Sequence, residues 1–399
     1  MAHRPFEAAP SPGHPPGRAA SGPSGRSPNP SSTRANGQPA NGQPADGQPA
    51  DAPDTARLPG RAAENTPRQG PRTGPPRADR GTYAALDLGT NNCRLLIARP
   101  QEDGFVVVDA FSRVVRLGEG LAATGRLSDA AMDRAVSALS ICADKLMRRH
   151  VTLVRSVATE ACRRATNGAD FVARVHRETG IALEVITAET EAKLAVLGCH
   201  ALLEPGDGPA LVFDIGGGST ELVLIDTAAG EPRIVDWFSA PWGVVSLSEN
   251  DPHVGDDADA LEAAYHRMKA RVAHAFSGFH GAIGARMPGP MRLLGTSGTV
   301  TTLASVHLKL PSYDRRAIDG LIVPSESMRA ISARLARMSV TERATLACIG
   351  HERADLVVAG CAILDAILDI WPAERLGVAD RGIREGILRT LMGRERARA

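Results

Sequence analysis

The chain has 399 residues, which is enough for one large domain or two of ordinary size. Its formal net charge is +1, and residues 81–399 carry 36 Lys and Arg against 39 Asp and Glu, a balance that does not suggest a specific nucleic-acid partner. The six Cys include no CxxC pair, which disfavours a zinc site or a disulfide framework, and the apolar runs are too short or too interrupted to cross a membrane, so we expect a cytoplasmic protein.

Residues 1–80 differ in composition from the rest of the chain. They hold 17 of the 28 prolines and ten Arg against six acids, and the string Ala-Asn-Gly-Gln-Pro at 35–39 recurs at 40–44 and, with Asp for Asn, at 45–49. Such a segment cannot bury enough apolar surface to offset the entropy lost on ordering, so we predict a disordered tail. The less favoured alternative is an Arg-bearing arm that touches RNA, polyphosphate or a partner protein.

Residues 81–206 are predicted to form a first α/β lobe, in which strands and helices alternate. The strands expected from apolar and β-branched residues are 83–88, 93–98, 104–111, 153–159 and 183–187. The expected helices are 128–149 with Ser128 as N-cap, 169–179 closed by Gly180, and 189–201. A linker rich in Pro and Gly, 204–209, ends the lobe.

The first two strands enclose a turn of small polar residues, Asp87–Asn92, in which Gly89 is the only glycine. Backbone N–H groups in such turns bind phosphate oxygens, and Arg94 on the second strand could fork onto a phosphate. The carboxylate of Asp87 cannot bind phosphate directly, so it is predicted to hold a metal ion or a water. The alternative is an ordinary Asn-containing hairpin turn without a ligand.

Two further polar strings lie in the first lobe, Thr159–Asn167 and Glu189–Lys193. Arg163 or Arg164 would bind an anionic chain if it lay at a phosphate cleft. Acids in the first turn of a helix, such as Glu189 and Glu191, are expected from the helix dipole, so the residues by themselves favour a structural role there.

Residues 207–380 are predicted to form a second lobe, which repeats the opening of the first with strands at 210–215, 221–226 and 233–239. The elements expected after them are helix 258–276, strand 291–295, helices 299–308, 325–338, 341–348 and 354–370, strand 376–379 and a final helix 383–395. Two similar lobes imply a cleft between them, and ligands favour such interfaces.

The turn between the first two strands of this lobe is the most informative motif in the chain. A strand that ends in Asp214 is followed by three glycines and a serine, Gly216, Gly217, Gly218 and Ser219, and then by Glu221. Consecutive glycines weaken a strand unless the backbone itself is used. We expect a phosphate nest here, with Asp214 and Glu221 holding a divalent cation such as Mg²⁺. The alternative is a tight hairpin without a ligand.

A third turn of small residues, Gly295, Thr296 and Ser297, leads from a strand into a helix. The free N–H groups of a helix N-terminus form an anion site, although Ser297 or Thr299 could simply cap the helix. The sequence contains no Ser-His-Asp arrangement, GxSxG string or Walker A motif.

Together these strings resemble the Ppx/GppA phosphatases, which are exopolyphosphatases and guanosine pentaphosphate phosphohydrolases of the actin, sugar kinase and Hsp70 ATPase superfamily. The strings that carry the resemblance are Asp87–Asn92, Arg116–Leu121, Asp214–Glu221, Gly295–Thr299 and Glu352–Asp355. The likeness covers about residues 82–395. It implies an α/β fold of two ribonuclease-H-like lobes with a cleft between them, and a last helix, within 381–399, that returns to the first lobe.

The resemblance also assigns roles to residues. It makes Glu191 the catalytic base and Arg163 a phosphate-binding residue. It implies two phosphate-binding sites. One is formed by Gly89, Thr90, Asn91 and Arg94, and the other by Gly216, Gly217, Gly218 and Ser219. The residues themselves add the turn at Gly295, Thr296 and Ser297 as a further phosphate contact, and Asp87, Asp214 and Glu221 as the expected ligands of Mg²⁺.

The implied reaction is hydrolysis of terminal phosphoanhydride bonds of inorganic polyphosphate, with guanosine pentaphosphate as the alternative substrate. A regulator that binds polyphosphate or a nucleotide without turnover is the alternative from another class, and a kinase would need an acceptor aspartate that we cannot identify. A homodimer is plausible from the family. Three features depart from the family pattern: Lys193 stands in place of an arginine, Asn92 in place of a serine, and the C-terminal HD-like extension of longer members is absent.

Overall fold

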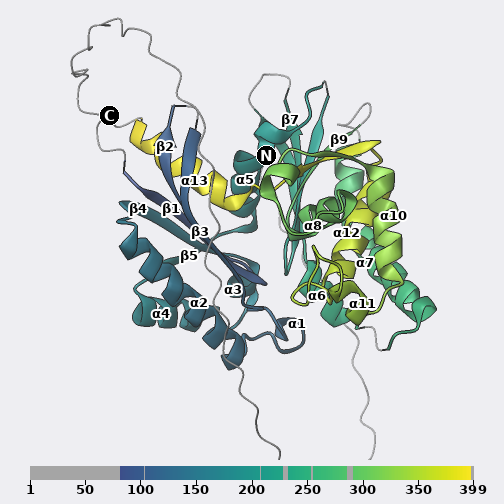
Figure 1. Cartoon of the computed structure of the whole chain (residues 1–399), viewed down its shortest axis with the longest axis horizontal. Helices are drawn as coiled ribbons and strands as arrows, with labels where there is room; N and C mark the ends of the chain where they lie inside the picture. Colours follow the sequence, from purple (N-terminus) through teal and green to yellow (C-terminus); the bar gives the residue numbers. More distant parts are fainter. Residues whose placement is uncertain are drawn as a thin grey trace, which may run out of the picture. The chain divides into compact units, whose positions relative to one another are not determined.

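The computed structural model describes residues 81–102, 104–206, 208–227, 232–252, 255–284 and 291–396, with side chains up to 393. These residues belong to one compact unit, Thr73–Ala399. The predicted disordered tail, 1–80, lies outside the described residues. The described strands form two sheets (Figure 1).

The first sheet has the strand order β3-β2-β1-β4-β5. Strands β1, β2 and β3 form an antiparallel meander, while β4 runs parallel to β1 and β5 parallel to β4. The bounds of the strands are β1 Tyr83–Leu88, β2 Asn92–Gln101, β3 Gly104–Val114, β4 Leu153–Ala158 and β5 Leu183–Val185. The fifth strand is shorter than predicted because Thr187 caps the following helix instead of extending the strand.

The second sheet has the order β10-β11-β9-β6-β7-β8, and its strands from β11 to β8 repeat the first sheet, with β10 added antiparallel to β11. The bounds are β6 Ala210–Ile215, β7 Thr220–Asp226, β8 Arg233–Ala240, β9 Arg292–Thr296, β10 Ile322–Pro324 and β11 Arg375–Ala379. The predicted fold of two ribonuclease-H-like α/β lobes is therefore confirmed.

The predicted helices are present with shifted ends. Their bounds are α2 Asp129–Arg148, α4 Gly168–Thr179, α5 Ala188–Cys199, α7 Ala258–Ile283, α8 Gly298–His307, α10 Ser325–Ala336, α11 Val340–Ala344, α12 Val357–Ile370 and α13 Ile383–Arg396. Ser128 accepts a hydrogen bond from the Ala131 amide at the start of α2, and Gly180 ends α4 in the left-handed conformation, both as predicted.

The elements that sequence patterns missed are all short. They are α1 Leu121–Thr124, α3 Glu160–Arg164, α6 Val244–Asn250, α9 Arg315–Ile318, the 3₁₀ turn His200–Leu202 and strand β10. A segment of at most two turns shows too little periodicity to be recognised. Helix α7 runs one to two turns further than predicted, and α11 ends four residues earlier.

Each sheet is packed on both faces. Alternate residues of the first sheet, such as Leu86 and Leu95, pack with α2 and α4, and alternate residues of the second, such as Phe213, pack with α7, α8, α10 and α12. The other face of each sheet is covered by a helix that belongs, in sequence, to the opposite lobe. Helix α13 covers the first sheet (yellow in Figure 1), and α5 covers the second.

Helices α5 and α13 touch through their backbones. A Cβ on Gly198 would lie 2.0 Å from the Gly382 carbonyl oxygen, and a Cβ on Gly386 would lie 2.0 Å from the Leu194 carbonyl oxygen. Real Cβ atoms do not approach so closely, so both positions require glycine. The crossing brings the start of α5 close to the strand ends of both lobes.

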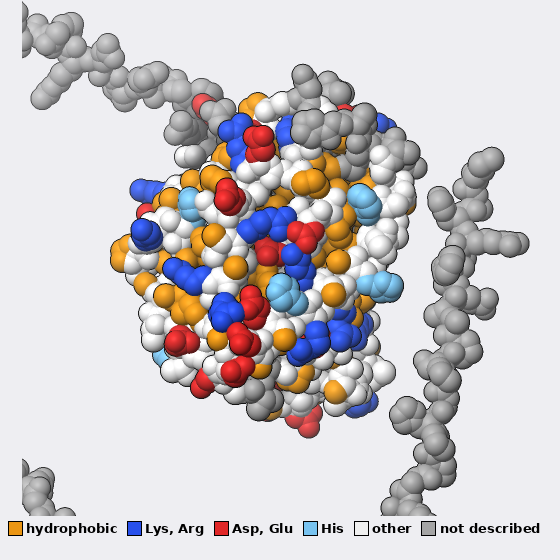
Figure 2. All heavy atoms as spheres, turned by 90° about the vertical axis from the view of Figure 1, so that its right-hand side faces the viewer, with side chains coloured by type: hydrophobic (Ala, Val, Ile, Leu, Met, Phe, Trp, Pro, Cys, Tyr) orange, Lys and Arg blue, Asp and Glu red, His pale blue; other side chains and the backbone are white. Residues whose placement is uncertain are grey.

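The outer face of the second lobe carries charges of both signs. Figure 2 shows Lys and Arg interspersed with Asp and Glu there, and Asp369 of α12 pairs with Arg329 and Lys269, each at 2.7 Å. None of the described helices is long and apolar enough to span a bilayer.

Candidate active site

The main cleft of the described structure lies where strands of the two lobes end. The turns after β1 and β6 line it, together with the starts of α5 and α8. The site residues predicted from the sequence that line this cleft are Asp87, Gly89, Thr90, Asn91, Arg94, Glu191, Asp214, Gly216, Gly217, Gly218, Ser219, Glu221 and Ser297. Most of the candidates predicted from separate strings of the sequence therefore lie in one place.

The glycines of the second turn allow the two lobes to touch. A Cβ on Gly217 would lie 2.9 Å from Thr90 Cβ and 3.0 Å from the Asn91 amide nitrogen, and a Cβ on Gly218 would lie 2.8 Å from Thr90 Oγ1. Any side chain at these positions would push the turns apart. The glycines thus serve the contact between the two turns as well as any approach of a ligand.

The two turns are equivalent in register but differ in charge. Asp87 lies opposite Arg94 in the first hairpin, and Asp214 lies opposite Glu221 in the second. The first lobe therefore presents an acid and a base where the second presents two acids. Ser219 and Ser239 both donate to Glu221 Oε1, at 2.7 and 2.8 Å, which fixes this buried carboxylate.

Burial strongly affects the acids of the cleft. Burial, followed by repulsion from Glu221, raises the pKa of Asp214 to about 8. Burial also raises the pKa values of Asp87 and Glu221 above their usual range, in the second case against the hydrogen bonds from the two serines. A cation between these groups would favour their ionised forms.

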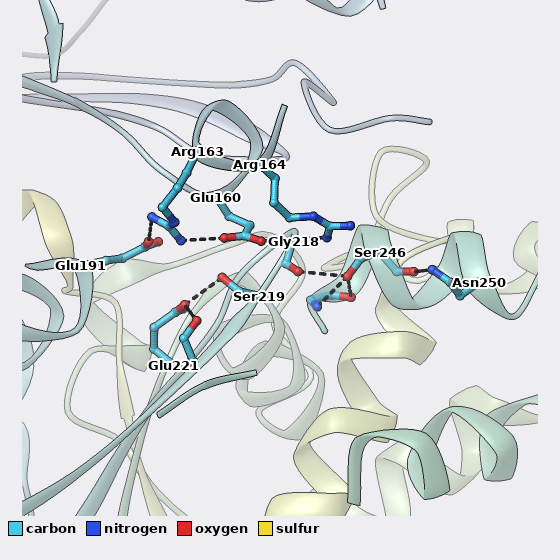
Figure 3. Close-up of polar contacts among 11 residues, drawn as sticks. Glu160, Arg163, Arg164, Glu191, Gly218, Ser219, Glu221, Ser246 and Asn250 are labelled. Atoms are coloured by element: carbon cyan, nitrogen blue, oxygen red, sulfur yellow. Dashed lines mark hydrogen bonds and ion pairs between the residues drawn. The ribbon is translucent and has the colours of Figure 1, made fainter. Parts of the chain in front are cut away.

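Glu191 is held by an arginine at the start of α5. Thr187 caps this helix, and Arg163 donates to Glu191 Oε2 at 3.2 Å and to Glu160 Oε2 at 2.7 Å. Figure 3 shows Arg163 joining the two glutamates, with Ser219 and Glu221 of the other lobe nearby. Burial and then the charge of Glu221 raise the pKa of Glu191 well above its usual range, and Arg163 opposes that rise.

The structure separates Glu191 from its neighbour Glu189. Glu191 is 7% exposed, whereas Glu189 is exposed and pairs with Lys193 at 2.7 Å, outside the cleft. A signal for this was present in the sequence: the residues three, four and seven positions after Glu191 are apolar or glycine, which places it on the buried face of the helix. Lys193, one of the departures from the family pattern, also lies away from the site.

Two arginines from different lobes face each other across the start of α8. A Cβ on Gly298 would lie 3.8 Å from Arg94 Nη2 and 3.8 Å from Arg353 Nη1. Arg353 also donates to Thr302 Oγ1 at 2.8 Å. Burial and then the neighbouring Arg94 lower the pKa of Arg353. Two converging cations beside a helix N-terminus make a site for an anion.

Three predicted phosphate-binding residues do not line the cleft. Gly295 packs against Phe213, whose ring a Cβ would meet at 2.6 Å, and Thr296 donates to the Arg381 carbonyl oxygen at 2.7 Å. Arg163 is engaged by Glu160, Glu191 and the Ile186 carbonyl oxygen. The structure thus places Arg163 outside the cleft lining, in contact with Glu191.

Sequence reasoning missed Glu160, Thr302 and Arg353, which all line the cleft. Glu160 follows β4, which runs beside β1, so the two strand ends meet, and this neighbourhood could have identified it. Arg353 stood in the string Glu352–Asp355 of the family resemblance without an assigned role.

The carboxylates of the cleft fit a cation that takes part of its ligands from water or from a bound phosphate. In the part of the chain that the structure describes, Asp87 Oδ1 is buried without a hydrogen-bond partner, and burial and then the charges of Glu221 and Asp87 raise the pKa of Asp214. Among the described residues, however, no group of three or more His, Cys, Asp or Glu side chains is arranged to hold a metal by itself. Mg²⁺ commonly binds one or two carboxylates and otherwise keeps waters and phosphate oxygens, so the buried carboxylates of this cleft are sufficient protein ligands for it.

The model of the Ppx/GppA phosphatase family matches residues 96–395, which include the second lobe, the first lobe from within β2 onward and most of the residues that line the cleft. The chain belongs to the Ppx/GppA phosphatase family. Its members share the overall architecture described above: the crystal structure of the Aquifex aeolicus Ppx/GppA protein superposes with a TM-score of 0.63 at 27% identity, covering 79% of this chain and 98% of that one.

Two curated Ppx/GppA relatives carry different names. Exopolyphosphatase 2 of Mycobacterium tuberculosis is 33% identical over 330 residues, which cover 78% of this chain and 98% of that protein. The guanosine-5'-triphosphate,3'-diphosphate pyrophosphatase of Aeromonas hydrophila is 30% identical over 312 residues, which cover 78% of this chain but 59% of that protein.

Proposed function

We propose that this protein is an exopolyphosphatase, which hydrolyses the terminal phosphoanhydride bond of inorganic polyphosphate and releases orthophosphate. The observation that carries the proposal is that Arg94 and Arg353, one from each lobe, converge in the same cleft that a buried carboxylate, Glu191, lines. Converging cations bind a terminal phosphate and stabilise its negative charge, and a carboxylate in the same cleft can accept a proton from the attacking water. The similarity to Exopolyphosphatase 2 over nearly all of that protein supports the same reaction.

In the proposed reaction, the backbone N–H groups of Thr90–Asn91 and Gly217–Ser219 bind the phosphate oxygens, together with Arg94 and Arg353. The amides of Gly89 and Gly216 instead close their turns by donating to the Asn92 and Ser219 carbonyl oxygens, each at 2.9 Å. Glu191 orients a water and takes its proton while the water oxygen attacks the terminal phosphorus. The bridging P–O bond breaks, and the polyphosphate leaves shorter by one unit. Catalysis of this kind rests on positioning and on electrostatic stabilisation of the equatorial oxygens.

In this site, one or two of the carboxylates of Asp87, Asp214 and Glu221 would bind Mg²⁺ directly, and waters and phosphate oxygens would be its other ligands. The ion supplies charge neutralisation at the transferred phosphate when it is bound. Ser219 and Ser239 keep the Glu221 carboxylate in place, and Arg163 keeps Glu191 in place.

Guanosine pentaphosphate is the alternative substrate, because the Aeromonas hydrophila relative is similar over 78% of this chain. Both substrates end in a phosphoanhydride, so the cleft residues treat their ends alike. Release of orthophosphate from long-chain polyphosphate and from guanosine pentaphosphate, compared by kcat/KM with Mg²⁺ present, separates the two. A higher kcat/KM for the nucleotide would overturn the preference proposed here.

A binding protein without turnover is the alternative from another class. Tight binding of polyphosphate with no orthophosphate release under any condition would establish it in place of an enzyme. The family also suggests a homodimer, which sedimentation at several protein concentrations tests directly.

A further inference from the structure

The segment Val115–Gly120, between β3 and α1, supports the first phosphate-binding turn. The amides of Val115 and Arg116 donate to the Asn91 carbonyl oxygen at 2.8 and 3.0 Å, and the Gly118 amide donates to the Thr90 carbonyl oxygen at 2.9 Å. A Cβ on Gly118 would lie 2.3 Å from Thr90 Cγ2, so the segment is pressed against the turn. The position of this segment therefore fixes the position of Thr90 and Asn91.

The side chain of Arg116 reaches the other lobe. Its guanidinium donates two hydrogen bonds to the Asp355 carboxylate, at 2.7 and 3.1 Å, and a longer one to the Glu352 carbonyl oxygen at 3.4 Å. Such a bidentate pair fixes direction as well as distance. Asp355 stands two residues after Arg353, which lines the cleft.

The segment that carries Arg353 is held from inside its own lobe as well. The fully buried Arg343 donates to the Ala354 carbonyl oxygen at 2.7 Å and to the Met338 carbonyl oxygen at 2.9 Å. Arg353 is thus flanked by an anchor within its lobe, at Ala354, and by an anchor to the first lobe, at Asp355.

The backbone of Arg116 is in a conformation that non-glycine residues rarely adopt. Its φ is +47°, in the left-handed region. Arg134 holds this geometry by donating to the carbonyl oxygens of Val115 and Arg116, at 2.9 and 3.2 Å. Strain of this kind persists where surrounding contacts over-determine it, and it concentrates at functional sites.

We propose that Arg116 is a positioning residue that sets the first-lobe phosphate turn and Arg353 of the second lobe in register. Its amide supports the turn at Thr90–Asn91, and its guanidinium fixes the segment that carries Arg353. One residue therefore links the phosphate-binding groups of the two lobes. This inference rests on the proposed function, because it needs a phosphate between the lobes.

The test compares Arg116→Asn, Asp355→Asn and the double variant in orthophosphate release from polyphosphate. Asparagine tolerates the left-handed conformation, so Arg116→Asn removes the ion pair without adding backbone strain. The matched control is Glu184→Gln, which breaks the bidentate pair of Arg155 and Glu184 within the first lobe, at 2.9 and 3.0 Å. Thermal unfolding is measured for every variant.

We expect each single variant to lower kcat/KM on the order of 10-fold to 100-fold, the range associated with small errors of substrate positioning. The double variant should lose no more than either single variant, because both remove the same contact. The exchanged pair, Arg116→Asp with Asp355→Arg, should recover part of the loss. The melting temperatures should change no more than that of Glu184→Gln, which should keep wild-type activity.

Single variants within twofold of the wild type would overturn the proposal, and so would losses that add in the double variant. Loss of activity that follows a fall in melting temperature would also overturn it, since the role would then be structural. A wild-type protein that releases no orthophosphate from any phosphoanhydride would instead refute the proposed function.

Discussion

Arg163 Nη1 lies 3.2 Å from Glu191 Oε2, and the other terminal nitrogen of the same guanidinium lies 2.7 Å from Glu160 Oε2. The arginine therefore contacts the proposed base without lining the cleft itself, and its donors are used by two carboxylates and a carbonyl oxygen. Its effect on the reaction would act through the position and the pKa of Glu191.

Replacement of Glu191 by Gln should lower orthophosphate release by about 10²–10⁴-fold, the usual contribution of a general base. The amide keeps the shape of the side chain but cannot take a proton from water. The matched control is Glu189→Gln, two residues earlier in the same helix, which breaks only the exposed pair with Lys193. Near-normal release by Glu191→Gln would remove this residue from the mechanism.

Replacement of Arg163 by Gln should move the acidic limb of the kcat/KM profile to higher pH. Arg163 lowers the pKa of Glu191, so its loss lets burial and Glu221 raise that pKa further, and the base stays protonated over a wider range. Arg164→Gln is the control, because Arg164 lies near Glu160, at 3.9 Å, and is the more exposed of the two arginines. An acidic limb that stays in place would contradict this role for Arg163.

The stability of the metal-free protein should fall as the pH rises from about 4 to about 8. The pKa of Asp214 is about 8 in the folded protein and 3.8 in an unperturbed state, so the folded form retains a proton that the unfolded chain has released. One such group contributes a slope of at most about 1.4 kcal/mol per pH unit. Asp214→Asn should flatten the curve and be the more stable protein at pH 8.

Chemical unfolding in EDTA across this pH range measures that slope. Mg²⁺ should then raise the melting temperature of the wild type at pH 8 more than at pH 5, and that of Asp214→Asn much less, because the cation favours the ionised carboxylates. Parallel stability curves for the two proteins would show that Asp214 does not titrate in this way.

Replacement of Gly298 by Ala should raise the KM for polyphosphate about tenfold or more without destabilising the fold. The new methyl group would meet Arg94 and Arg353 at 3.8 Å, an ordinary contact in the free protein, but it would occupy space between the two cations. Gly281→Ala in α7 is the control, since a Cβ there has no neighbour within 4 Å. Equal KM values for the two variants would place the phosphate elsewhere.

The parts of the site that the sequence predicted are local. A strand that ends in Asp214 and continues into three glycines determines its own turn, so the order of these residues is enough to predict that turn. Glu191 needed the family resemblance, although its place on the apolar face of α5 was a usable signal. The pairing of Arg116 with Asp355 spans 239 residues and depends on how the lobes meet, so no pattern in either string could predict it.

The exchange of α5 and α13 between the sheets has a consequence for biosynthesis. Leu388 and Leu391 fill much of the core on one face of a sheet whose strands end at Val185, so most of that face stays uncovered until α13 has left the ribosome. The nascent first lobe would expose Ala85 and Leu96 throughout synthesis of the second. Fragments cut at the linker should therefore aggregate alone and recover solubility only when expressed together.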